Sequence, residues 1–161
     1  MKTNAVTKDA IFSKNRKHRY ALIRTWNTAL PMMMCIGLNP SVANEQQDDP
    51  TIRRVINFAE KWGFGGVYMC NLFSYITSYP EQLKITKNNS KNDFYLKSYA
   101  EKSQEVLCAW GRHKAAKERA TKVLKMMHHT TALQINKDGS PKHPLYVKAG
   151  VERVAFPNSE F

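Results

Sequence analysis

A continuous apolar run over residues 32–38, followed at once by a polar turn, constrains the fold of this chain more than any other feature. The run closes on five residues, Gly37, Leu38, Asn39, Pro40 and Ser41. Such an ending is typical of a buried strand that stops at a tight turn. Two further apolar runs, over residues 67–72 and 105–110, end at Asn71 and immediately before Gly111. Because ligands of open α/β sheets bind at the carboxyl ends of the strands, these three endings predict a site there.

Strand and helix patterns alternate along the rest of the chain and predict an α/β domain. Residues 19–26 alternate polar and apolar side chains, as a half-buried strand does. We expect helices over residues 50–62, 93–103 and 113–127, and a short strand over residues 131–135. The expected fold is a three-layer sandwich around a central, mostly parallel four-stranded sheet. Residues 1–17 are expected to form a basic flexible arm, and residues 18–161 a single domain.

The net charge of +12 is unevenly distributed along the chain. Residues 1–30 carry seven Lys or Arg against one Asp, and residues 81–161 carry fifteen against eight acidic residues. Residues 31–80 are nearly balanced, with three basic and four acidic residues. Such asymmetry suits a polyanionic partner, so we predict nucleic acid, DNA above all. The alternative is a basic surface that only keeps the protein in solution.

The cysteines and the apolar runs indicate the cellular compartment in which we expect the protein. The three cysteines lie inside apolar runs and are expected to be small core residues, without disulfides and without a metal. The N-terminus lacks the apolar core of a signal peptide, and no apolar run approaches the length of a membrane span. We therefore expect a cytoplasmic protein and a monomer, with no membrane partner, no metal site and no cofactor.

Three polar residues at predicted strand ends or loops are candidates for chemistry. Asn39 could orient a water molecule or contact a base edge, and the alternative is an Asx turn. A buried Asn71 needs partners, and an amide is suited to bidentate recognition of a nucleobase; the alternative is a turn cap. His143 precedes Pro144 and could donate to a developing negative charge, although an ordinary surface histidine would look the same.

Neighbouring residues add weaker candidates. Phe73 could stack on a base or merely fill a loop. Asp49, which precedes Pro50, is expected to cap a helix rather than bind a metal. Arg53 and Arg54 follow near the N-terminus of that helix, where a positive charge opposes the helix dipole. That placement predicts a contact with a phosphate, and the alternative is a solvated outer face.

The order of these segments resembles that of the uracil-DNA glycosylase superfamily. Gly37-Leu38-Asn39-Pro40 is similar to the first motif of its mismatch-specific branch, residues 67–71 to the strand that ends in the base-reading Asn, and His143-Pro144 to the start of the last motif. The resemblance implies that Asn39 and His143 are catalytic and that Lys142, beside the last motif, contacts a phosphate, whereas the segment with Arg53 and Arg54 is not a glycosylase motif. It implies a substrate-binding set of Gly37, Leu38, Pro40, Ser41, Asn71, Phe73 and Gly111. Two departures stand out, because Asn39 replaces a carboxylate and Leu145 replaces a serine.

The chain is also similar, over most of its length, to a family of bacterial and phage domains of unknown function, DUF1643. The similarity includes Asp48-Asp49-Pro50-Thr51-Ile52-Arg53-Arg54 and residues 62–66, 71–73 and 142–146. Two functions stay open. One is excision of a normal or modified base by hydrolysis of its N-glycosidic bond. The other is a non-catalytic module that binds nucleic acid or a nucleotide on the same fold, and an enzyme acting on a free nucleotide is a third, weaker reading.

Overall fold

The computed structural model describes residues 7–86 and 88–157. They form one seven-stranded mixed sheet with the order β1-β2-β4-β3-β5-β6-β7. The strands are β1 Thr7–Phe12, β2 Arg19–Thr25, β3 Met32–Gly37, β4 Gly66–Asn71, β5 Glu105–Cys108, β6 Thr130–Ala132 and β7 Val154–Ala155. The helices are α1 Pro50–Lys61, α2 Ser90–Glu101 and α3 Ala116–Leu124, with two short 3-10 helices, η1 Pro80–Gln82 and η2 Pro144–Tyr146. The sheet thus has seven strands where the sequence predicted four.

The four central strands are parallel to one another, whereas β1, β2 and β7 run antiparallel to their neighbours. In space the parallel strands follow the order β4-β3-β5-β6, so the chain moves to one side of β3 first and then to the other. The point of reversal lies between β3 and β5. In doubly wound sheets, the crevice beyond the strand ends at such a point is where ligands bind.

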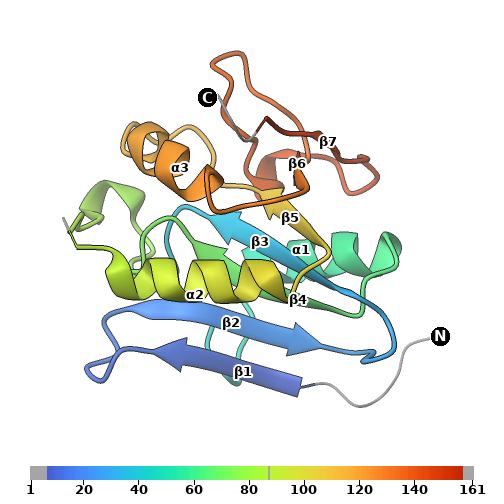
Figure 1. Cartoon of the computed structure of the whole chain (residues 1–161), viewed down its shortest axis with the longest axis horizontal. Coiled ribbons are helices and arrows are strands. Elements are labelled where there is room, and N and C mark those ends of the chain that lie inside the picture. Colours follow the sequence, from blue (N-terminus) through green and yellow to red (C-terminus); the bar gives the residue numbers. More distant parts are fainter. Residues whose placement is uncertain (1–6, 87, 158–161) are drawn as a thin grey trace.

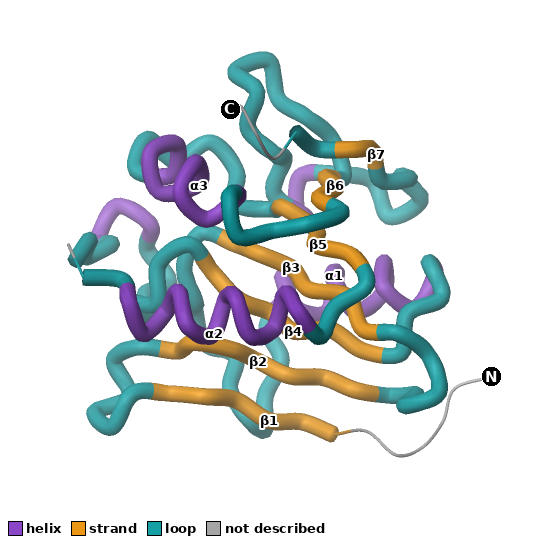
Figure 2. Tube along the Cα trace, viewed as in Figure 1, coloured by secondary structure: helices purple, strands orange, loops and turns teal. Residues whose placement is uncertain are grey.

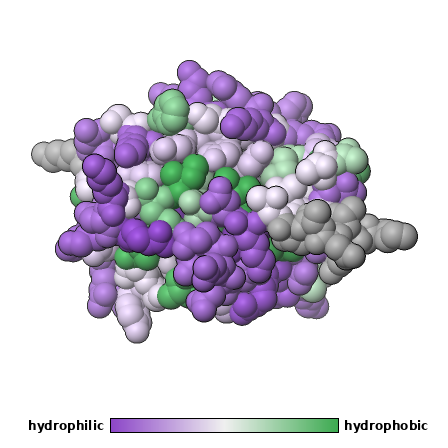
Figure 3. Space-filling model, turned by 90° about the horizontal axis from the view of Figure 1, so that it is seen from below, coloured by the Kyte–Doolittle hydropathy of each residue, from purple (hydrophilic) through white to green (hydrophobic). Residues whose placement is uncertain are grey.

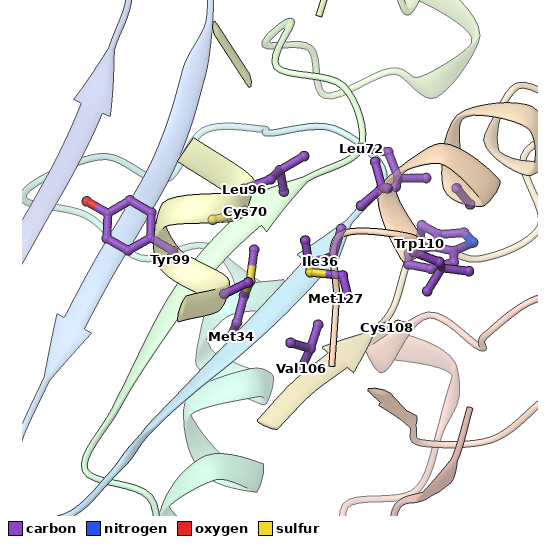
Figure 4. Close-up of a cluster of buried hydrophobic side chains, with 14 of the residues drawn as sticks. Met34, Ile36, Cys70, Leu72, Leu96, Tyr99, Val106, Cys108, Trp110 and Met127 are labelled. Carbon is purple, nitrogen blue, oxygen red and sulfur yellow. The ribbon is translucent and has the colours of Figure 1, made fainter. Parts of the chain in front are cut away.

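The helices cover both faces of this sheet (Figures 1 and 2). Side chains of α2 and α3 pack with Met34, Ile36 and Cys70 on one face, and Figure 4 shows part of this cluster. Side chains of α1 pack with Met33 and Cys35 on the other face. All three cysteines are buried and free, as expected for core residues. Burial raises the pKa of the Cys70 thiol to about 12, so it stays uncharged.

Helix α1 begins and ends as its sequence predicts. Asp49 caps it, since its Oδ1 accepts a hydrogen bond from Ile52 N at 2.9 Å, and Pro50 occupies the first turn. Four apolar side chains recur at helical spacing and are buried against the sheet, namely Ile52, Val55, Phe58 and Ala59. Gly63 follows the helix with a φ of 87°, a left-handed conformation that favours glycine.

The N-terminal segment differs from the predicted arm. Residues 1–6 lie outside the described residues, but Thr7–Phe12 form the edge strand β1, which pairs antiparallel with β2. The polar half of β1 is exposed, so its sequence lacks the regular alternation of a half-buried strand. Seen from the side where β1 is the edge strand, the surface is mostly hydrophilic around a small hydrophobic area (Figure 3). No helix in residues 7–86 and 88–157 is long and apolar enough to cross a membrane.

Candidate functional site

A cavity of about 530 Å³ opens at the carboxyl ends of the parallel strands, beside the reversal point between β3 and β5. The residues after β3, the end of β4, the turn after β5 and the segment around His143 all contribute to its wall. The start of β2 and the start of α1 complete it. This volume is in the range of natural small-molecule sites. Figure 1 shows these segments converging at one end of the central strands.

The cavity brings together seven of the residues that the sequence singled out. They are Gly37, Leu38, Asn39, Ser41, Asn71, Gly111 and His143. Five others do not line it, namely Pro40, Phe73, Arg53, Arg54 and Lys142. The strand ends therefore converge as the sheet rule predicts, whereas all three proposed phosphate contacts lie outside the cavity.

Asn71, at the end of β4, is the best-placed polar group for a ligand. Its side chain is 1% exposed, and its Nδ2 has no hydrogen-bond partner among the described residues. An unpaired buried donor of this kind costs about 1–3 kcal/mol. The neighbouring strand makes room for it, because a Cβ on Gly37 would lie 2.8 Å from Asn71 Oδ1. Asn71 thus has a donor ready for a ligand that fills the cavity.

Asn39 is largely committed to its own loop. Its Nδ2 donates to Pro40 O at 3.0 Å and to Thr77 O at 2.9 Å. Thr77 N in turn donates to Pro40 O at 3.0 Å. The amide therefore fixes the loop after β3 against residues 75–77, which is close to the Asx-turn alternative. Within residues 7–86 and 88–157, its side-chain hydrogen bonds all come from Nδ2 and none involves Oδ1.

His143 reaches the cavity from the long segment after β6. Its backbone is extended before Pro144, and its Nδ1 accepts a hydrogen bond from Leu145 N at 3.1 Å. Burial lowers the pKa of His143, and the nearby Asp49 carboxylate raises it by less. The neutral ring therefore carries its proton on Nε2, which can donate to a ligand. Gly111 beside it has a φ of 75°, a left-handed conformation that favours glycine, and a Cβ there would make only ordinary van der Waals contact with His143 Cβ at 3.7 Å.

Arg54 positions this histidine segment and does not line the cavity. Its Nε donates to Pro144 O at 3.2 Å, and its Nη2 donates to Val147 O at 2.8 Å. These bonds join α1 to η2. Its neighbour Arg53 is exposed and donates to Asp48 O at 3.3 Å. Sequence alone does not separate the two arginines, because the partners of Arg54 lie about ninety positions further along the chain.

The other residues outside the cavity have structural surroundings. Phe73 is buried in the cluster under α2 and α3 and borders a second, open hollow of about 440 Å³. Pro40 is buried, and its carbonyl takes part in the loop contacts just described. Lys142 Nζ lies 3.5 Å from Gln134 Oε1, and its backbone N donates to Gln134 O.

Two charged residues in the cavity wall are absent from the sequence-based site. Arg19, the first residue of β2, is 3% exposed, and Asp49 is buried at the cap of α1. Asp49 raises the pKa of both Arg19 and His143, so its carboxylate acts on both groups. The sequence predicts Asp49 as a helix cap, and in the structure the same residue also lines the cavity. Within the described ranges, no group of three His, Cys, Asp or Glu residues could hold a metal ion.

Comparison with known protein families shows which family the chain belongs to. Residues 19–145 match the family described as protein of unknown function, DUF1643. The chain belongs to this family. The matched region of DUF1643 runs from the buried Arg19 to Leu145 and contains every residue that lines the cavity except Tyr146. No curated protein and no solved structure matches the chain.

Proposed function

We propose that this DUF1643 protein is similar in function to uracil-DNA glycosylases: it binds a nucleobase of DNA in the cavity and hydrolyses its N-glycosidic bond. The buried amide of Asn71 is the observation that carries the proposal. Paired donors and acceptors on an amide match the edge of a base; Asn71 lines the cavity, and its buried Nδ2 has no hydrogen-bond partner among the described residues. A target base in DNA would have to leave the stack to reach it.

The other polar groups fit the chemistry of base release. His143 Nε2–H can donate to the negative charge that develops on the departing base. The Asp49 carboxylate can stabilise positive charge on the sugar or accept a proton from the attacking water. This supplies the carboxylate that Asn39 lacks, while Asn39 Oδ1 can hold the water as an acceptor.

The electrostatics favour a polyanionic partner over a neutral one. The chain carries a net charge of +12, and Arg112 and His113 lie at the cavity wall, where the exposed Arg112 side chain is 3.5 Å from the Asp138 carboxylate. A DNA backbone that approaches this mouth would meet positive charge before any base contact forms. The proposed form is a monomer on one DNA site.

Base release from defined DNA tests the proposal. The protein is incubated with single- and double-stranded oligonucleotides that contain uracil, mismatched thymine or a hypermodified pyrimidine, and the free base is measured by mass spectrometry. We expect release from at least one substrate, with loss of release in His143→Ala and Asn71→Ala. Arg53→Ala, which changes an exposed side chain outside the cavity, is the matched control and keeps activity.

A second candidate is a binding module that recognises a base or nucleotide without cleaving it. The commitment of both Asn39 amide hydrogens to backbone carbonyls favours it, because that residue then has little freedom to direct a water. The same assay separates the two. Absence of release from every substrate, with DNA binding that Asn71→Ala weakens, would support the binding module and refute the glycosylase.

A further inference from the structure

The buried arginines of this fold differ in how many of their guanidinium nitrogens form hydrogen bonds. On β2, Arg24 is 1% exposed, and all three of its guanidinium nitrogens donate hydrogen bonds, including Nε to Asp48 Oδ1 at 2.8 Å. On α3, Arg119 donates from Nε to Leu72 O and from Nη2 to Asp93. Arg19, five residues before Arg24, donates from Nη1 to Ala43 O at 2.9 Å. Its Nε has no partner in the part of the chain that the structure describes.

A β-bulge turns Arg19 toward the cavity. Ile11 pairs with Ala21 and Phe12 pairs with Arg19, so Tyr20 is an extra residue on β2. Ala21 packs on the α2 side of the sheet, and the Tyr20 ring stacks on Tyr95 of that helix at 5.2 Å. Arg19 is then left on the opposite side, in the cavity wall. Bulges occur often beside sites, where they redirect a side chain in this way.

The charge of Arg19 is incompletely balanced inside the protein. Asp49 raises its pKa, but burial lowers it by more, and the pKa falls to about 10. The arginine is still protonated at neutral pH. A buried cation of this kind gains from any ligand that brings negative charge and acceptor oxygens. Asn71, whose buried Nδ2 also lacks a partner among the residues that the structure describes, lines the same cavity.

We propose that the Nε edge of Arg19 binds an anionic oxygen group of the ligand at the inner wall of the cavity. This inference rests on the proposed function, since the ligand is taken to be a nucleobase or nucleotide. A guanidinium edge matches a carboxylate or a phosphate, which both present oxygens that only accept hydrogen bonds. The group is either a carboxylate carried by a modified base or the phosphate of a nucleotide.

Two matched pairs of probes distinguish these sources. The first pair is a single-stranded oligonucleotide with one 5-carboxyuracil and the same strand with thymine at that position. The second pair is thymidine 5′-monophosphate and thymidine. Dissociation constants are measured by calorimetry at one fixed salt concentration. We expect wild-type protein to bind the anionic member of one pair about tenfold more tightly or better, and that pair identifies the source.

Variants of Arg19 test whether this residue causes the preference for the anionic probe. Arg19→Met removes the donors at similar length and is expected to bring the ratio of the two dissociation constants close to one. Arg19→Lys keeps the charge beside Asp49 but lacks the planar donor edge, so it is expected to lose most of the preference even if Arg19→Met fails to fold. Arg53→Met removes the same charge from the surface and keeps the wild-type ratio.

The outcomes separate this inference from the proposed function. Binding of the neutral probes with ratios near one in both pairs would overturn the role of Arg19 and leave the base pocket standing. An unchanged preference in folded Arg19→Lys would overturn it as well. If the wild-type protein binds no probe of either pair, the inference and the base pocket are both wrong.

Discussion

Asp49 caps α1 through Oδ1 and also lines the cavity, so a single carboxylate has a structural and an electrostatic role. Asparagine caps a helix about as well as aspartate does, whereas alanine does not. The two roles can therefore be separated by choosing the substitution. The same holds for three other residues of the cavity wall, because their surroundings decide their roles more than their residue types do: Gly37, Asn71 and His143.

Asp49→Asn should abolish base release while keeping the helix cap. Asp49→Ala should lose both, and its free energy of unfolding should be lower than that of Asp49→Asn by about 1 kcal/mol, the usual value of a cap. Chemical denaturation and the release assay measure the two effects. Full activity in Asp49→Asn would show that the carboxylate only caps the helix.

Gly37→Ala should disable the ligand contact of Asn71 with a small effect on folding. The added methyl would lie 2.8 Å from Asn71 Oδ1 and 3.0 Å from Met69 Cε, and both are ends of side chains that can move. We expect a loss of about 1 kcal/mol in stability, at the low end for overpacking. Affinity for the base probe should fall at least as far as in Asn71→Ala. Unchanged affinity would mean that Asn71 does not contact the ligand.

His143 should make stability depend on pH in the acidic range. Burial lowers its pKa in the folded state below its ordinary value near 6.5, so the unfolded chain binds the proton more readily. The contribution to stability is fully present above about pH 6.5 and is lost as the pH falls toward the folded pKa. His143→Gln should reduce this loss in denaturation curves between pH 7 and pH 5. Burial also lowers the pKa of His18, so His18→Gln is the parallel variant.

At the scale of elements, the strand ends and α1 follow from local pattern, and the other parts do not. Continuous apolar runs locate β3 and β4, and the Asp-Pro start locates α1. The contacts of Arg54 with η2 depend on partners about ninety positions away in the sequence, so no local pattern reveals them. The edge strand β1 resembles an unstructured arm in the sequence for a different reason, because its polar half is exposed and lacks the alternation of a half-buried strand.

Arg54→Lys should loosen the histidine segment. A lysine cannot donate to Pro144 O and Val147 O at the same time with the geometry of a guanidinium. We expect stability to fall by about 1–3 kcal/mol and amide hydrogen exchange to rise across residues 145–147. Arg53→Lys, one position earlier and exposed, should stay within about 0.5 kcal/mol of wild type. Equal effects in the two variants would contradict the positioning role of Arg54.

At the scale of the whole molecule, topology decides which residues meet. The order of the four parallel strands places the ends of β3 and β5 beside each other at the reversal point. Ligands of open α/β sheets bind beyond the carboxyl ends of the strands, and this rule, applied to the sequence, is enough to predict that Asn39, Asn71 and Gly111 surround one cavity. It does not locate Arg19, because β2 joins the sheet antiparallel and brings its first residue, not its last, to that end. The buried cation is therefore the part of the site that only the three-dimensional structure reveals.

The net positive charge of the molecule leads to a prediction about the salt dependence of DNA binding. If the basic surface binds the DNA backbone, the logarithm of the association constant should fall linearly with the logarithm of salt concentration, with a slope of about −0.9 for each phosphate contacted on duplex DNA. Arg112→Gln, at the mouth of the cavity, should reduce the magnitude of that slope by about one. Lys97→Gln, on α2 and outside the cavity wall, should leave it unchanged. Fluorescence anisotropy with a duplex at several salt concentrations measures the slope, and a nearly flat line would exclude DNA and favour a small free ligand.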